Sequence, residues 1–576
     1  MTLRRLYLYV VSAVSLGLLA AGLSLLGNTV LLFLFNDPSA QYSRTQLAGF
    51  TAMTAVALPV WGIHFWFARR YAMRDPYERA SAIRRLYVYG ACLGSAIGVL
   101  VALAISLGYL LRLFIDPCGP FRETGQPCTL ARAVGIEQLI AETPNPWWLP
   151  AAQAGWVAAV FLAIWAFHFW IAARDRAAVG ETCASATLRR WYMYVVLLGG
   201  LLVMLSGASS LIQGLWLNVV NSPLANNVDI GGATGLLLAG LLVWGFHART
   251  VSRNHVADDR HSTLRAVQGF IGLAVTIAIA LFGASQILYY ALARALGVDN
   301  PGGAGNDILG ALAAPASLLV VYGIAWFLMR RRLARDAETQ EGDRQAGIRR
   351  LYTNLASLVS LGAWAIGAGG LLWTLAEQAE APIIGVTAGD WRNPVSLWLM
   401  LLVVGAVAWL AHWRQAPWAA DRQALPRRLY VWAALLASVL AALGAGVGML
   451  AAVLRQAFSA RPTLTDSANL DFGHSLALLI VAAGVGIYHW RVLRADAAAR
   501  PAKAATEPAP VGAVVAAATP VLVPVSEVAD PNTRRYLLSV TDATADDVHQ
   551  ALSSLPPHAA YKLTPTERGA LPVDGH

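Results

Sequence analysis

The stretch Arg4-Arg5-Leu6-Tyr7-Leu8-Tyr9 opens an apolar run that continues to about residue 35. The same start recurs as Arg84-Arg85-Leu86-Tyr87-Val88-Tyr89, Arg189-Arg190-Trp191-Tyr192-Met193-Tyr194, Arg349-Arg350-Leu351-Tyr352 and Arg427-Arg428-Leu429-Tyr430. A degenerate copy, Leu264-Arg265-Ala266-Val267, lies between the third and fourth of these. The six starts have a mean spacing of about 85 residues, which indicates tandem repeats.

A second signature follows each start after a further apolar run. It reads Gly62-Ile63-His64-Phe65-Trp66, Ala166-Phe167-His168-Phe169-Trp170, Gly245-Phe246-His247, Ala411-His412-Trp413 and Tyr488-His489-Trp490. The fourth unit has Gly323-Ile324-Ala325-Trp326 instead, without histidine, so this unit is degenerate at both signatures. Each unit therefore reads as one helical hairpin.

Twelve runs are long enough to cross a bilayer, which needs about 20 apolar residues in a helix. They cover roughly 6–35, 47–67, 86–115, 149–172, 191–220, 231–248, 266–296, 308–329, 351–376, 394–413, 429–454 and 472–490. Only 13% of the residues are charged and the mean hydropathy is +0.53. A soluble domain carries about 25% charged residues, so the composition excludes that class. The net charge of +10 indicates no nucleic-acid partner, because the arginines gather at helix ends.

Lysine and arginine distribution predicts the topology. The side that carries the arginine-rich starts holds 29 of the 43 Lys and Arg, and the opposite side holds eight. We therefore expect an all-α polytopic protein of the bacterial plasma membrane, with six parallel tandem helical hairpins and both termini cytoplasmic. The expected repeats are about 1–80, 81–185, 186–262, 263–345, 346–424 and 425–494.

The chain beyond the last hairpin has a different composition. Residues 495–530 are rich in Ala and Pro, which predicts a disordered linker. Residues 531–576 form a small cytoplasmic segment that is too short to hold a core, so we expect it to engage a protein partner.

The repeated histidines are the main candidates for a site. Imidazoles on bundled helices can hold haem or chlorin. A structural role is the alternative that we favour, since an imidazole at a helix end can hydrogen-bond a carbonyl or a repeat tyrosine. We accordingly expect no cofactor, with haem or chlorin as the competing hypothesis. The residues concerned are His64, His168, His247, His412 and His489.

The arginine pairs are expected to bind anionic lipid headgroups on the cytoplasmic side and to fix helix depth. These residues are Arg4, Arg5, Arg84, Arg85, Arg189, Arg190, Arg349, Arg350, Arg427 and Arg428. In the long external loop, Cys118 and Cys128 bracket a short turn and are expected to form a disulfide, with two free thiols as the alternative.

The interiors of the spans carry little chemistry. We find no Asp, Glu, Lys or Arg near the centre of any span, whereas ion-coupled transporters usually keep such groups there. The polar residues available are Asn28, Gln213 and Gln286. The chain has no phosphate-binding loop, no metal-ligand spacing and no nucleophile motif, so we expect neither an enzyme nor a metal site.

With these Arg-Arg-Leu-Tyr-x-Tyr starts and glycine-rich first helices, the chain resembles a bacterial membrane family known only as a domain of unknown function. Its members are two-helix modules that often occur in tandem. The resemblance covers about 1–494 as six copies and brings no activity, ligand or site residue with it. We expect a structural, accessory or scaffold role. The alternatives are a transporter or channel for a neutral or apolar solute, and a haem- or chlorin-binding protein.

Overall fold

The computed structural model describes residues 2–35, 44–115, 148–180, 183–253, 262–303, 307–338, 343–383, 387–413, 422–458 and 468–498. Within them every regular element is helical. The long helices are α1 (Thr2–Leu34), α2 (Arg44–Arg74), α4 (Ala82–Ile115), α8 (Leu149–Val179), α9 (Cys183–Val219), α10 (Ile230–Arg253), α12 (Thr263–Ala295), α13 (Ile308–Glu338), α14 (Asp343–Glu380), α15 (Arg392–Trp413), α17 (Leu425–Phe458) and α18 (Ala468–Ala498). Short helical segments are α3 (Pro76–Ala80), η2 (Pro223–Asn227) and η3 (Pro301–Gly303).

Twelve helices in the described ranges are long and apolar enough to cross a membrane, which confirms the twelve predicted runs. Most helices extend beyond those runs. The arginine starts lie inside their helices, near the N-terminal ends, and α8 continues to Val179, eleven residues past His168. Hydropathy follows only the bilayer-facing part of a helix, whereas Arg, Ala and Glu continue a helix readily beyond it. For the same reason α18 runs to Ala498, into the stretch predicted to be a linker.

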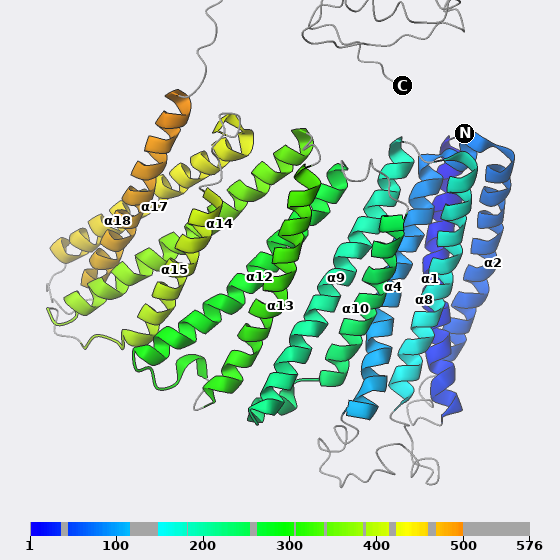
Figure 1. Ribbon diagram of the computed structural model, residues 1–576, viewed down its shortest axis with the longest axis horizontal. Helices are drawn as coiled ribbons and strands as arrows, with labels where there is room; N and C mark the ends of the chain where they lie inside the picture. The colour runs from blue at the N-terminus through cyan, green and yellow to red at the C-terminus, as the bar shows by residue number, and fades with distance from the viewer. Residues whose placement is uncertain are drawn as a thin grey trace, which may run out of the picture. The chain divides into compact units, whose positions relative to one another are not determined.

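Consecutive long helices pack against one another as six pairs, which we number in chain order. They are pair 1 (α1, α2), pair 2 (α4, α8), pair 3 (α9, α10), pair 4 (α12, α13), pair 5 (α14, α15) and pair 6 (α17, α18). In pairs 1 to 5 the first helix also packs on both helices of the next pair, and Figure 1 shows the helices in this order. The substantial contacts between pairs in the described part of the chain all join chain neighbours.

Close helix packing is clearest where α4 meets α10. A Cβ atom at Gly235 would lie 2.5 Å from the backbone nitrogen of Gly108 and 2.5 Å from the carbonyl oxygen of Ala104. Two glycines thus let the two backbones approach, as small residues do between membrane helices.

Buried apolar side chains form three clusters. One joins pairs 1, 2 and 3, one joins pairs 3 and 4, and one joins pairs 5 and 6. Among the residues that the structure describes, no such cluster joins pair 4 to pair 5.

Candidate functional site

Each repeat histidine lies against the tyrosine that begins the other helix of its own pair. The tyrosine hydroxyl is within hydrogen-bond distance of histidine Nε2 in all five pairs that keep both residues. The distances are 3.2 Å for Tyr7–His64, 3.1 Å for Tyr87–His168, 2.7 Å for Tyr192–His247, 3.2 Å for Tyr352–His412 and 2.9 Å for Tyr430–His489.

The other ring nitrogen of each histidine is also engaged. Nδ1 lies 2.8 Å from the backbone carbonyl oxygen four residues earlier, at Val60, Ile164, Val243, Ala408 and Val485. A carbonyl only accepts hydrogen bonds, so Nδ1 carries the proton and Nε2 accepts from the tyrosine hydroxyl. A metal at Nε2 would have to displace that tyrosine.

A tryptophan from the preceding pair completes the arrangement at three junctions. Its indole Nε1 donates to the hydroxyl oxygen of the next pair's tyrosine. The distances are 3.0 Å for Trp61–Tyr87, 2.8 Å for Trp165–Tyr192 and 2.9 Å for Trp409–Tyr430. A chain of hydrogen bonds therefore runs from tryptophan to tyrosine to histidine to carbonyl, and we call it the Trp-Tyr-His tie. It joins one pair to the next.

The tyrosine and histidine are buried in the three pairs where the tie is complete, and more open in pairs 1 and 5. His168, His247 and His489 are buried, as are Tyr87, Tyr192 and Tyr430. In pair 1, which no described pair precedes, His64 is half-buried and Tyr7 is exposed. Polar side chains that are shielded in this way must satisfy their hydrogen bonds within the protein.

Sequence reasoning found the tyrosines and histidines but missed the tryptophan between them. The signal was present: a tryptophan stands three residues before the histidine in four units, as Trp61, Trp165, Trp244 and Trp409. The spacing puts both rings on one helix face. Pair 4 has Tyr322 in that position and no motif tyrosine of its own.

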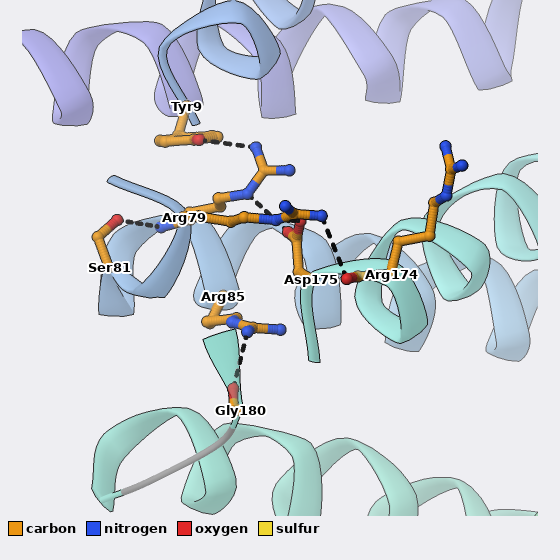
Figure 2. Close-up of polar contacts among 8 residues, drawn as sticks. Tyr9, Arg79, Ser81, Arg85, Arg174, Asp175 and Gly180 are labelled. Atoms are coloured by element: carbon orange, nitrogen blue, oxygen red, sulfur yellow. Dashed lines mark hydrogen bonds and ion pairs between the residues drawn. The ribbon is translucent and has the colours of Figure 1, made fainter. Parts of the chain in front are cut away.

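Several starting arginines bind carboxylates at the end of the second helix of their own pair. In pair 2, Arg84 Nε lies 2.7 Å from Asp175 Oδ2, and its Nη1 lies 3.1 Å from the Tyr9 hydroxyl of pair 1. Arg79 Nε reaches the other oxygen of Asp175 at 2.8 Å. In Figure 2 the Arg79 side chain also reaches the carbonyl of Arg174, whereas Arg85 points toward Gly180. Asp175 thus holds two guanidinium groups.

The same arrangement recurs in other pairs. Arg265 forms a bidentate ion pair with Asp336, in which Nε and Nη2 lie 2.9 and 3.0 Å from the two carboxylate oxygens. Arg427 Nε lies 2.7 Å from Asp496 Oδ2. In pair 1, Arg4 and Arg5 both lie 2.7 Å from Glu78 on α3. These carboxylates went unnoticed in the sequence, although they are among the few acids at the basic end of the helices.

The predicted lipid-anchoring arginines therefore fall into different environments. Arg84, Arg85 and Arg427 are buried and have protein partners, which leaves no surface for a headgroup. Arg4 and Arg428 are exposed, and lipid anchoring stays a prediction for them. The remaining members are half-buried, namely Arg5, Arg189, Arg190, Arg349 and Arg350.

The other candidate residues are less organised. Cys118 and Cys128 lie outside the described residues, and Cys92 is a buried free thiol on α4. Asn28 is half-buried, and its backbone carbonyl accepts a hydrogen bond from Gln153 at 3.4 Å. In the described ranges we find no group of three or more His, Cys, Asp or Glu residues that could hold a metal ion.

These features define an all-helical protein built of repeated helix pairs, with twelve described helices that are long and apolar enough to cross a membrane. The chain belongs to a family described as a domain of unknown function (DUF5671), whose model matches residues 5–136, 128–239 and 350–474, more than half of the sequence. The family unit therefore matches three times rather than as the six short copies expected, and each match is longer than one helix pair. Pair 4 lies outside all three matches, in agreement with its degenerate signatures. No curated protein and no solved structure matches the chain.

Proposed function

We propose that this protein is a noncatalytic structural or accessory scaffold in the bacterial plasma membrane. Its six two-helix units lie parallel, and both termini face the cytoplasm. The observation that carries the proposal is the Trp-Tyr-His tie, in which both nitrogens of each repeat histidine are used by the protein itself.

Two further observations support a structural role. The ties and the ion pairs at Asp175 join helices within a pair and from one pair to the next. They lie at the arginine-rich end of the helices, which carries 29 of the 43 Lys and Arg and is therefore assigned to the cytoplasm. We expect exposed arginines at that end, such as Arg4 and Arg428, to contact anionic headgroups.

The test is the visible absorption spectrum of the full chain, purified in mild detergent and recorded oxidised and reduced. A structural scaffold is colourless. A Soret or chlorin band at near-stoichiometric level, lost in His168→Ala or His247→Ala without unfolding, would establish the pigment-binding alternative and overturn the proposal.

The transport alternative has its own readout. Sealed proteoliposomes that contain the protein are expected to show no protein-dependent flux of small neutral solutes. A saturable flux that disappears in the Asn28→Ala, Gln213→Ala double variant would show a conducting path and contradict the scaffold role.

A further inference from the structure

A cavity lies where pair 4 meets pair 5. It has a volume of about 270 Å³ and is lined by all four helices of the two pairs. Among the described residues, no buried apolar cluster spans this junction, and pair 4 lacks the tyrosine and histidine of the repeat. The cavity thus coincides with the degenerate unit.

The corresponding position between pairs 2 and 3 is nearly filled. The cavity there is lined by Phe169, Ala173, Arg189 and Tyr192, and its volume is about 10 Å³. In repeat register these residues match Trp326, Arg330, Arg349 and Tyr352, which line the large cavity. The two junctions are built from equivalent positions, so the extra space distinguishes the junction of pairs 4 and 5 from that of pairs 2 and 3.

One position in the repeat is smaller beside this cavity than in other pairs. In pairs 2, 3 and 6 the residue before the histidine is aromatic and packs on the tryptophan of the preceding pair. The ring centroids are 5.8 Å apart for Phe167–Trp61, 5.1 Å for Phe246–Trp165 and 5.6 Å for Tyr488–Trp409. In pair 5 this residue is Ala411, which lines the cavity, and the tryptophan position of pair 4 is Tyr322.

The lining has an excess of positive charge and also includes apolar side chains. Its charged members are Arg265, Arg330, Arg349 and Asp336, of which Arg265 and Asp336 are ion-paired to each other. Arg330 stands over the ring of Trp326, with 5.5 Å between its Cζ and the ring centroid. Farther along α12 from Arg265, Phe270 and Leu273 supply the apolar part. Arginine is the residue best suited to hold phosphate and carboxylate groups, and ligand pockets are mostly apolar with a few polar groups.

We propose that this cavity binds an amphipathic anion: a single phosphate or carboxylate head held by Arg330 and Arg349, with its apolar chain against Phe270 and Leu273. An anionic phospholipid of the surrounding bilayer and a free fatty acid both have this chemistry. The site goes beyond the scaffold role and does not depend on it, because the Trp-Tyr-His ties lie at other junctions.

Native mass spectrometry of the full chain in mild detergent tests the site, with phosphatidylglycerol, lauric acid and phosphatidylcholine as probes. We expect one phosphatidylglycerol or one laurate to be retained per chain, and phosphatidylcholine to be retained at least about tenfold less. The better of the two anionic probes identifies the source of the ligand. Equal retention of phosphatidylcholine, or retention of none of the probes, would overturn the proposal.

Two variants assign the bound molecule to the cavity. Ala411→Phe restores the aromatic side chain of pairs 2 and 3 and is expected to abolish retention. Arg330→Gln keeps the space but removes a charge, and we expect binding to weaken about tenfold. The matched control is Arg174→Gln, because Arg174 stands over Trp170 at 4.5 Å in the same i, i+4 relation but lines neither cavity.

The test remains decisive if one variant fails to fold. If Ala411→Phe does not fold, as judged by size-exclusion chromatography, the comparison of Arg330→Gln with Arg174→Gln decides the outcome. Equal losses in those two arginine variants, or unchanged binding by a folded Ala411→Phe protein, would show that the lipid binds elsewhere and would refute the site.

Discussion

The indole nitrogen of Trp165 in pair 2 donates to the hydroxyl oxygen of Tyr192 in pair 3 at 2.8 Å, and that hydroxyl lies 2.7 Å from Nε2 of His247. One tyrosine thus accepts a hydrogen bond from one helix pair and donates a hydrogen bond within the next. Because the Nδ1–H of His247 donates a hydrogen bond to the Val243 carbonyl, the series ends on the backbone. The repeat motif therefore encodes a connection between units as well as the units themselves.

Tyr192→Phe is expected to destabilise the protein by about 1–3 kcal/mol, because it leaves the Trp165 donor and the His247 acceptor unsatisfied in a buried site. Denaturation by SDS in mixed micelles measures the change. The control is Tyr7→Phe, since Tyr7 is exposed and has the same contact to histidine. We expect it to cost less than about 1 kcal/mol. Equal losses in both variants would mean that burial of the tie does not matter.

Much of this architecture could be predicted from the sequence. Hydropathy and the Arg-Arg-Leu-Tyr starts located all twelve helices, because bilayer thickness sets their length. The sequence also predicts that a repeat histidine hydrogen-bonds a carbonyl or a repeat tyrosine, and His247 contacts both Val243 and Tyr192. The tryptophan was missed because its hydrogen-bond partner is the tyrosine of the next pair. Motifs compared within one unit do not reveal partners in another unit.

The carboxylates and the cavity were harder to foresee. Asp175 and Asp496 each follow their histidine by seven residues, but Asp336 follows Ala325 by eleven, so the spacing to the histidine position is shared by only two of these arginine partners. The cavity is lined by Ala411, which is smaller than the aromatic residue at the same position of pairs 2, 3 and 6. Whether such a difference opens a cavity depends on the side chains that pack against that position. Three-dimensional packing decides both.

Asp175→Asn is expected to cost about 3–5 kcal/mol, because it leaves the buried guanidinium of Arg84 without its counter-charge. The matched control is Asp496→Asn, which affects a single arginine at a more exposed ion pair. Its loss should be clearly smaller. The comparison is made by SDS denaturation, and an unchanged midpoint for Asp175→Asn would contradict the role assigned to this ion pair.

The ion pair between Arg112 on α4 and Asp229, just before α10, is expected to depend on pH. Burial alone would raise the pKa of Asp229, but hydrogen bonds from Arg112 and from the backbone amides of Gly232 and Gly231 outweigh it and lower that pKa. A lowered carboxyl pKa gives stability that is present above the unfolded value of about 3.9 and is lost as the pH falls through the folded value. Both side chains are about two-fifths exposed, so we expect about 1 kcal/mol or less.

The measurement is the difference in melting temperature between the wild type and Asp229→Asn as the pH is lowered from 6 to about 3. The wild type should be the more stable at pH 6, and the difference should shrink in acid. Other carboxyl groups titrate in both proteins, so the difference isolates Asp229. A difference that is constant with pH would rule out this linkage.

Gly235→Ala is expected to destabilise the protein by about 1–3 kcal/mol, since its Cβ would overlap the α4 backbone and force the helices apart. Gly245→Ala on the same helix is the control, because no atom lies within 4 Å of its added Cβ. Alanine has a higher helix propensity than glycine, so the control variant should be as stable as the wild type or slightly more stable. Thermal unfolding in detergent distinguishes the two, and the same effect in both would argue against close backbone contact.

The central claim is that the repeat motif ties one helix pair to the next, and a double-mutant cycle tests it most directly. Trp165→Phe, Tyr192→Phe and the double variant are compared with the wild type by SDS denaturation in mixed micelles. We predict a coupling energy of about 0.5–1.5 kcal/mol between Trp165 and Tyr192. Either single variant already breaks the hydrogen bond between them, so the double variant loses that bond only once. Additive losses, within about 0.3 kcal/mol, would contradict the claim.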